Sequence, residues 1–169
     1  MNNELFRKVE ARLYDMYKKI KMINCLKREC ESLQEHADMI MKDIKRSNIS
    51  IEAEMYLGID YSSINVQTSH NGDSYMDREL IAAITRLENE WRYVRRKLIK
   101  KHEKIREIER SILTLKNNIE MLSEENKRFI ELKYGDKRSI PEIADMLNMG
   151  RTTAYRKREE LISDIAQWC

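Results

Sequence analysis

The stretch LIAAITRLENEWRYVRRKLIKKHEKIREIERSILTLKNNIEML, residues 80–122, decides the fold. Its apolar residues recur at alternating spacings of four and three positions, the heptad pattern of a helix with one apolar seam. Such a helix is about 65 Å long at 1.5 Å per residue, so a compact core cannot bury it and it needs a partner helix of similar length. The seam consists of Leu80, Ile84, Leu87, Trp91, Val94, Leu98, Lys101, Ile105, Ile108, Ile112, Leu115, Ile119 and Leu122.

Residues 1–46 contain a second seam of the same kind. Its spacing is regular except around Ile23, where two steps of three follow each other and overwind the helix locally. In an antiparallel hairpin, Ile44 would lie near Leu80, and Lys101, the one polar member of the other seam, would lie near Ile23. The alternative is a dimeric coiled coil, a homodimer in which each long helix meets its copy, and the sequence does not separate the two arrangements. The second seam consists of Phe6, Val9, Leu13, Met16, Ile20, Ile23, Leu26, Cys30, Leu33, Ala37, Ile40 and Ile44.

The composition favours an all-α protein. The 169 residues are 36% charged and include only four Gly and one Pro, whereas sandwiches, barrels and wound α/β sheets need a turn residue about every ten positions. Residues 47–77 carry five acidic and no basic side chains and separate the two heptad segments, 1–46 and 78–122. Within them Asn71-Gly72 is typical of a turn, and Ile64–Thr68 alternates like a short strand or extended segment. We predict an acidic irregular linker there.

Residues 123–169 predict a module of three helices. Ser123, followed by two acidic residues, is typical of an N-cap, and Gly135 ends the helix that it opens. The sequence Ser139–Glu142 is a capping box with proline in the first turn, and it opens a short second helix. Asn148 tolerates the left-handed backbone of a tight turn. The last helix is expected over 151–168.

The last two of these helices have the residue pattern of a helix-turn-helix. Ala144 is the small residue that such a motif needs where the helices approach each other. The inner faces are expected to consist of Ile140, Ile143 and Leu147 on one helix and Ala154, Leu161 and Ile165 on the other.

The beginning of the last helix is basic, hydroxylic and aromatic. Arginine reaches guanine with two hydrogen bonds, while threonine and tyrosine suit phosphate oxygens or the thymine methyl group. Further basic residues contact the DNA backbone. Acidic residues follow from Glu159 onward, so the DNA-facing part is expected to end within two turns. The candidate DNA-binding residues are Arg151, Thr152, Thr153, Tyr155, Arg156, Lys157 and Arg158.

Residues 123–169, with the segment RFIELKYGDKRSIPEIADMLNMGRTTAYRKREELI, resemble the DNA-binding module of sigma-70 family factors, the region 4 type that reads the −35 promoter element. Lys157 stands at an offset where that family is usually apolar. The layout of the whole chain resembles phage late-gene transcriptional regulators of the ArpU and RinA type. The resemblance implies a DNA-binding activator of late phage or prophage genes that acts with RNA polymerase on double-stranded DNA, in the cytoplasm of a bacterial host.

Other function classes find little support in the residue pattern. No apolar run approaches the roughly 18 residues of a membrane span. The three histidines are dispersed, and no catalytic set, phosphate loop or metal-ligand spacing stands out. We therefore expect neither an enzyme nor a metal site, and no cofactor or small-molecule substrate. Three cysteines, with Cys25 and Cys30 on different sides of a helix, fit a reducing, cytoplasmic setting.

Two rival functions remain open from the sequence. A small terminase-like subunit for phage packaging also combines a helix-turn-helix with a helical assembly domain. The chain could also be a coiled-coil protein-interaction module. The basic run Arg92–Arg106 is interpreted as a solvated coiled-coil surface rather than as a second phosphate site or an acidic-partner site.

Overall fold

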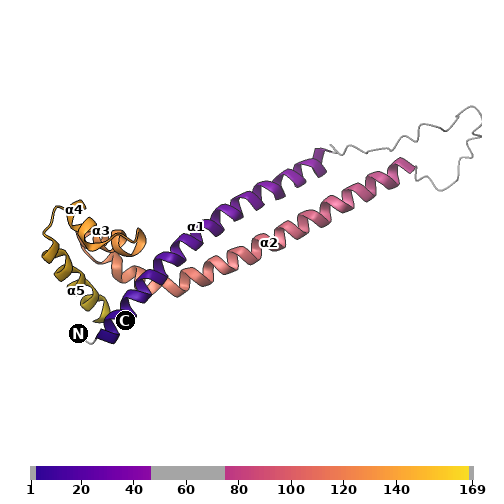
Figure 1. Cartoon of the computed structure of the whole chain (residues 1–169). Coiled ribbons are helices and arrows are strands. Elements are labelled where there is room, and N and C mark those ends of the chain that lie inside the picture. Colours follow the sequence, from indigo (N-terminus) through magenta and orange to yellow (C-terminus); the bar gives the residue numbers. More distant parts are fainter. Residues whose placement is uncertain (1–2, 47–74, 168–169) are drawn as a thin grey trace, which may run out of the picture. The chain divides into compact units, whose positions relative to one another are not determined.

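The computed structural model describes residues 3–46 and 75–167, and every regular element in them is a helix (Figure 1). The predicted all-α class is confirmed. The second long helix begins three residues earlier than expected and ends at Glu120. The turn and short strand expected within the acidic linker lie outside the described residues. The elements are α1 (Asn3–Arg46), α2 (Tyr75–Glu120), α3 (Glu124–Ile130), η2 (Glu131–Gly135), α4 (Ile140–Met146) and α5 (Arg151–Gln167).

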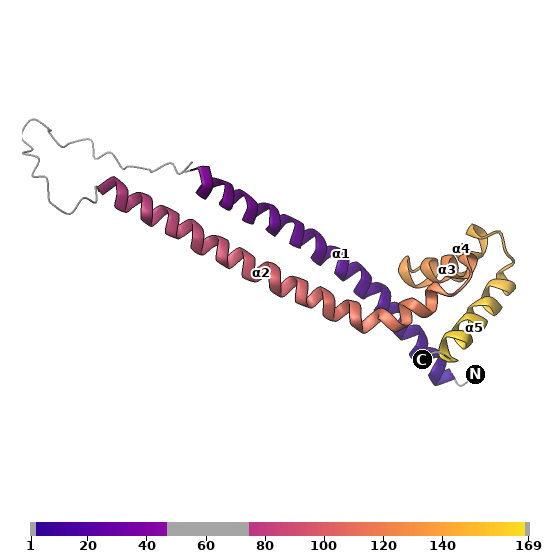
Figure 2. The ribbon, with the colours of Figure 1, turned by 180° about the vertical axis from the view of Figure 1, so that it is seen from behind.

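Both predicted seams face inward. No residue of either heptad series is exposed, and each one is buried or half-buried. By its internal contacts the chain divides into two compact units, and α1 and α2 each contribute a segment to both. Unit 1 comprises residues 1–29 and 101–169, and unit 2 comprises residues 30–100. Within each unit the α1 and α2 segments run antiparallel and side by side in one chain (Figures 1 and 2).

Unit 2 has a small apolar core. Ala37 and Ile40 of α1 and Val94 of α2 are buried together. Half-buried side chains, among them that of Trp91, pack against this cluster, so Trp91 belongs to the helix pair. Polar contacts flank the core, with His36 Nε2 3.3 Å from a Glu90 carboxylate oxygen.

In unit 1 the pairing register differs from the expected one. Lys101 forms an ion pair with Glu29 instead of lying near Ile23. Glu29 stands six positions further along α1 than Ile23, and the other polar contacts between the two helices also join residues further along than the expected pairing. Sliding two heptad helices by one repeat still matches apolar to apolar side chains, so the spacing alone does not fix the register. A second ion pair between the two helices joins Lys27 and Glu109 at 3.3 Å.

The deepest burial in the described residues lies in unit 1. The largest side chains with less than 2% exposure all belong to it, and two of them come from the beginning of α1 rather than from the C-terminal helices. The C-terminal module is therefore completed by α1, which lies against it in both views (Figures 1 and 2). These side chains are Phe129, Leu13, Ile130, Leu132, Ile143, Ile162, Ile165 and Val9.

Candidate functional site

In the C-terminal module, both predicted N-cap residues, Ser123 and Ser139, stand directly before a helix. Ser139 Oγ accepts a hydrogen bond from the Glu142 backbone N–H, and a Glu142 carboxylate oxygen accepts one from the Ser139 N–H at 2.7 Å. Ser123 is also an N-cap, but its side chain makes no capping hydrogen bond. The helix that it opens continues past Ile130 as a π-helix, η2, and ends at Gly135. The capping box thus fixes where α4 begins.

The turn between α4 and α5 sets the direction of α5. Asn148 has φ = 52°, the left-handed conformation expected of it, and the Met149 N–H donates to the Ala144 carbonyl at 2.9 Å. Ala144 and Ala154 are both fully buried, and α4 and α5 are in contact. Small side chains at these two positions let the helices approach closely. Lys137 also has a positive φ, of 58°, which the sequence did not indicate.

Five of the seven candidate residues lie on the exposed start of α5. Only Ala154 points into the module between residues 151 and 156, and about half of the Tyr155 side chain is exposed. Arg156 forms an ion pair with Glu160 at 3.5 Å, and both side chains are more than 60% exposed. An ion pair this exposed contributes little stability, so the guanidinium can exchange Glu160 for another anion at small cost. The five exposed residues are Arg151, Thr152, Thr153, Tyr155 and Arg156.

The other two candidates are engaged within the protein. Lys157, at the position where the resembled family is usually apolar, is only 16% exposed and forms an ion pair with Glu125 of α3. Arg158 donates from Nε and Nη2 to the same oxygen of Glu10, at 2.9 and 2.6 Å. Its guanidinium carbon also lies 4.8 Å from the centre of the Phe6 ring. The structure therefore separates these two residues from the exposed five.

Glu10 is the centre of a cluster that links α1, η2 and α5. The Tyr134 hydroxyl donates to the same Glu10 oxygen at 2.9 Å, and the Tyr134 ring meets that of Tyr14 edge to face at 4.9 Å. Burial and the nearby Glu10 carboxylate raise the pKa of Tyr134. Burial alone would lower the pKa of Arg158, but its hydrogen bonds to Glu10 raise the pKa overall. The cluster keeps Arg158 charged and its direction fixed.

A second contact between α1 and η2 lies about two to three turns beyond Glu10 along α1. Lys21 Nζ donates to the Gly135 carbonyl at 2.7 Å. A Cβ added at Gly135 would lie 3.0 Å from Tyr17 Cδ1, so glycine permits this close approach. Burial, followed by the charges of Glu131 and Asp136, raises the pKa of Tyr17 to about 12. No local sequence pattern predicts these contacts, because the partners are more than 100 residues apart in the chain.

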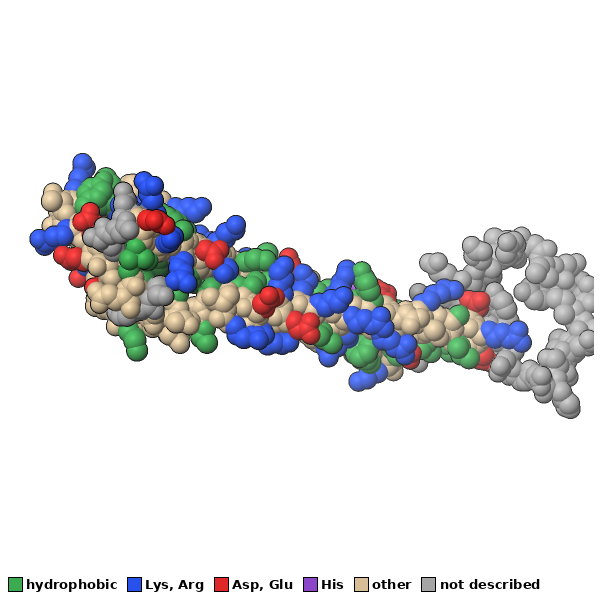
Figure 3. All heavy atoms as spheres, turned by 90° about the horizontal axis from the view of Figure 1, so that it is seen from below, with side chains coloured by type: hydrophobic (Ala, Val, Ile, Leu, Met, Phe, Trp, Pro, Cys, Tyr) green, Lys and Arg blue, Asp and Glu red, His purple; other side chains and the backbone are tan. Residues whose placement is uncertain are grey.

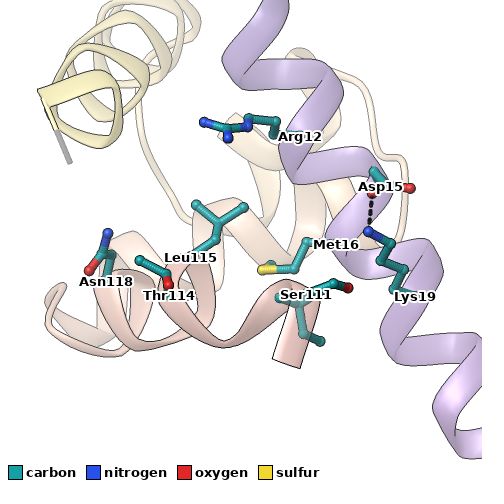
Figure 4. A pocket seen from close by; sticks show the side chains of 9 residues that line it. Arg12, Asp15, Met16, Lys19, Ser111, Thr114, Leu115 and Asn118 are labelled. Atoms are coloured by element: carbon teal, nitrogen blue, oxygen red, sulfur yellow. Dashed lines mark ion pairs between the residues drawn. The ribbon is translucent and has the colours of Figure 1, made fainter. Parts of the chain in front are cut away.

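Unit 1 also contains a groove between its α1 and α2 segments, with a volume of about 410 Å³ (Figure 4). Polar and apolar side chains line it, among them Arg12, Met16 and Thr114, and an Asp15–Lys19 ion pair of 2.9 Å lies on its α1 wall. The lining includes no set of residues suited to nucleophilic or acid–base catalysis. Among the described residues, no group of three or more His, Cys, Asp or Glu side chains could hold a metal ion.

The described helices include none that is both long enough and apolar enough to cross a bilayer. The candidate functional site is the exposed start of α5, a helix that packs on α4 and is bonded to α1 through Arg158. Comparisons with protein-family models, with curated proteins and with solved structures find no match to this chain.

Proposed function

We propose that this chain is a sequence-specific DNA-binding regulator of transcription whose α5 reads the major groove. One observation carries the proposal: the exposed start of α5, Arg151–Arg156, presents two arginines, two threonines and a tyrosine on a helix whose other side is buried. A helix that enters the major groove with its N-terminal residues needs this division between a packed side and a polar, basic side.

Each residue type on this surface has a role in DNA recognition. Arg151 and Arg156 can each make two hydrogen bonds to a guanine edge, and the threonines and Tyr155 can donate to phosphate oxygens. Arg151 has no ion-pair partner among the described residues, so no internal contact opposes its transfer to DNA. Exposed Glu159 and Glu160 lie three and four residues after Arg156 and would repel phosphates, which limits the contact to the first turns of α5.

The resemblance to phage late-gene regulators gives the proposal its biological setting. By that likeness the chain activates late phage or prophage genes together with RNA polymerase. Its module would serve as the counterpart of the region that reads the −35 element. The described fold is compatible with this role, since the exposed part of α5 is presented by a module that is packed on α1.

The test is selection of bound fragments from a random pool of duplex DNA with the full chain, followed by affinity measurements on the selected sequence. Arg151→Ala and Arg156→Ala are each expected to weaken that binding about 5- to 150-fold, which corresponds to about 1–3 kcal/mol, and to relax selection at one base pair. Arg110→Ala, an exposed arginine of α2, is the matched control and should change nothing. Selection of no sequence, or equal binding by all variants, would refute the proposal.

A further inference from the structure

In unit 2, the stretch of α2 from Trp91 to Lys100 contains five basic and no acidic residues. Elsewhere many basic side chains have a carboxylate one turn away, as in the exposed pairs Lys8–Glu4 and Lys116–Glu120. This local pairing is the general way in which a charged helix surface is balanced. The 91–100 stretch departs from it.

Three of the five basic side chains are exposed without an ion-pair partner among the described residues, namely Arg96, Lys97 and Lys100. Lys97 Nζ lies 4.5 Å from the centre of the exposed Tyr93 ring, a cation–π contact that leaves its charge uncompensated. Positions 93, 96, 97 and 100 fall on one side of a helix. We call these four residues the α2 basic face.

The two remaining basic residues of the stretch are engaged. Arg92 pairs with Glu88 at 3.2 Å, and Arg95 donates to Gln34 and lies over the Trp91 ring. Unit 2 therefore provides partners for Arg92 and Arg95 but no carboxylate for the α2 basic face. Figure 3 shows Lys and Arg side chains along the length of the long helices, with Asp and Glu side chains among them.

Leaving these charges unpaired has a physical cost. Arg92 and Arg96 are four residues apart, as are Arg96 and Lys100, and like charges at this spacing destabilise a helix. Among the described residues of unit 2, no carboxylate pairs with Arg96 or Lys100 to relieve this repulsion. A polyanion that lies along the α2 basic face would relieve it.

In place of the solvated surface expected from the sequence, we propose that the α2 basic face binds the phosphate backbone of duplex DNA, as a second contact that is independent of base sequence and of the exposed start of α5. The inference rests on the proposed DNA-binding function, which supplies the polyanion. Charge complementarity favours DNA, since a duplex carries one negative charge per about 1.7 Å of its axis. An acidic helix would need an apolar seam to dock, and the seam of α2 is already occupied by α1.

The experiment compares two triple variants of the full chain on a short random-sequence duplex between 50 and 200 mM salt. The test variant is Arg96→Gln, Lys97→Gln and Lys100→Gln. The matched control is Arg128→Gln, Lys8→Gln and Lys116→Gln, which also removes one arginine and two lysines but takes them from ion pairs. The slope of log affinity against log salt should become shallower by about 2 to 3 in the test variant, because each phosphate contact contributes about 0.9. The control should keep the wild-type slope.

The possible outcomes separate this inference from the proposed function. An unchanged slope in the test variant overturns the inference. Polyglutamate serves as a probe for an acidic protein. If the test variant keeps the slope but binds polyglutamate more weakly than the wild type, the partner of this face is an acidic protein. Sequence selection by the wild type that is relaxed at one base pair in Arg151→Ala, with the slope still unchanged in the test variant, upholds the proposed function alone. Loss of duplex binding in the test variant, with no sequence selection by the wild type and unchanged binding in Arg151→Ala, upholds the α2 basic face and refutes the role of α5. Absence of any duplex binding by the wild type refutes both.

Discussion

The Arg158 guanidinium donates both of its bonds to one Glu10 oxygen, and its partner is 148 residues away in the sequence. Spacing along a single helix groups Arg158 with Arg151, because both are basic residues on the same segment. Spacing carries no information about which other helix will cover the later turns. The chemical type of the candidate residues could therefore be predicted from the sequence, whereas the division into an exposed five and an engaged two required the fold.

We predict that Arg158→Ala lowers the free energy of unfolding by about 2 kcal/mol. Glu10 and Arg158 are 17% and 25% exposed, so their ion pair is neither fully at the surface nor fully buried. A surface pair is worth about 0–1 kcal/mol and disruption of a buried pair costs about 3–5 kcal/mol, so we expect a value between the two. The substitution also removes the Arg158 contact with Phe6. Urea unfolding followed by circular dichroism measures the change.

The control for this prediction is Lys8→Ala. Lys8 pairs with Glu4 on the same helix, but both side chains are about 70% exposed, so its removal should change stability by less than about 0.5 kcal/mol. Equal effects of the two substitutions would mean that the Glu10 cluster does not hold α5 on α1.

At the scale of single helices, the features that the sequence predicted are those encoded within a few neighbouring residues. The capping box at Ser139, the left-handed Asn148 and the end of a helix at Gly135 are all of this kind. The pairing register of Lys101 and the π-helical form of η2 were not predicted. The register depends on which of several equivalent heptad matches is chosen. The π-helix lies where η2 meets Tyr17 and Lys21 of α1, contacts that no local pattern contains.

We predict that Ser139→Ala destabilises the protein by about 1 kcal/mol, since it removes the acceptor for a backbone N–H of the first turn of α4. Ser123→Ala is the matched control at the other serine N-cap, whose side chain makes no capping hydrogen bond, and should cost clearly less. Thermal unfolding of the two variants compares them directly. A larger loss from Ser123→Ala would contradict the assignment of the capping box.

The same capping box gives a pH dependence of known sign. The hydrogen bond from the Ser139 backbone N–H, with that of its side chain, holds the pKa of the Glu142 carboxylate below its ordinary value. A carboxylate whose pKa is depressed by folding stabilises the protein above its unfolded pKa, and this contribution is lost as the pH falls through the folded value. Glu142→Gln should remove that part of the acid sensitivity. An NMR titration of Glu142 with a pKa at or above the ordinary value would contradict it.

At the scale of the whole chain, burial is distributed unevenly between the two units. The largest fully buried side chains all lie in unit 1, while the core of unit 2 consists of Ala37, Ile40 and Val94 with half-buried neighbours. The heptad pattern treats both ends of the long helices alike, because it indicates which side chains face the partner helix and not how many further elements cover them. The difference between the units was therefore not predictable from the spacing.

This difference predicts two levels of stability within the single helix α1. Regions with few fully buried side chains open at lower free energy, so backbone amides near Ile40 should exchange with solvent faster than those near Leu13, when native-state hydrogen exchange is measured on the full chain. Leu13→Ala should lower the opening free energy of unit 1 by about 2–5 kcal/mol, because a fully buried leucine leaves a cavity, and it should leave the fast amides of unit 2 nearly unchanged. Ile40→Ala should do the reverse. If both substitutions accelerated exchange equally along the whole of α1, the two units would unfold as one cooperative structure, and the covering of α1 by the C-terminal module would contribute nothing to local stability.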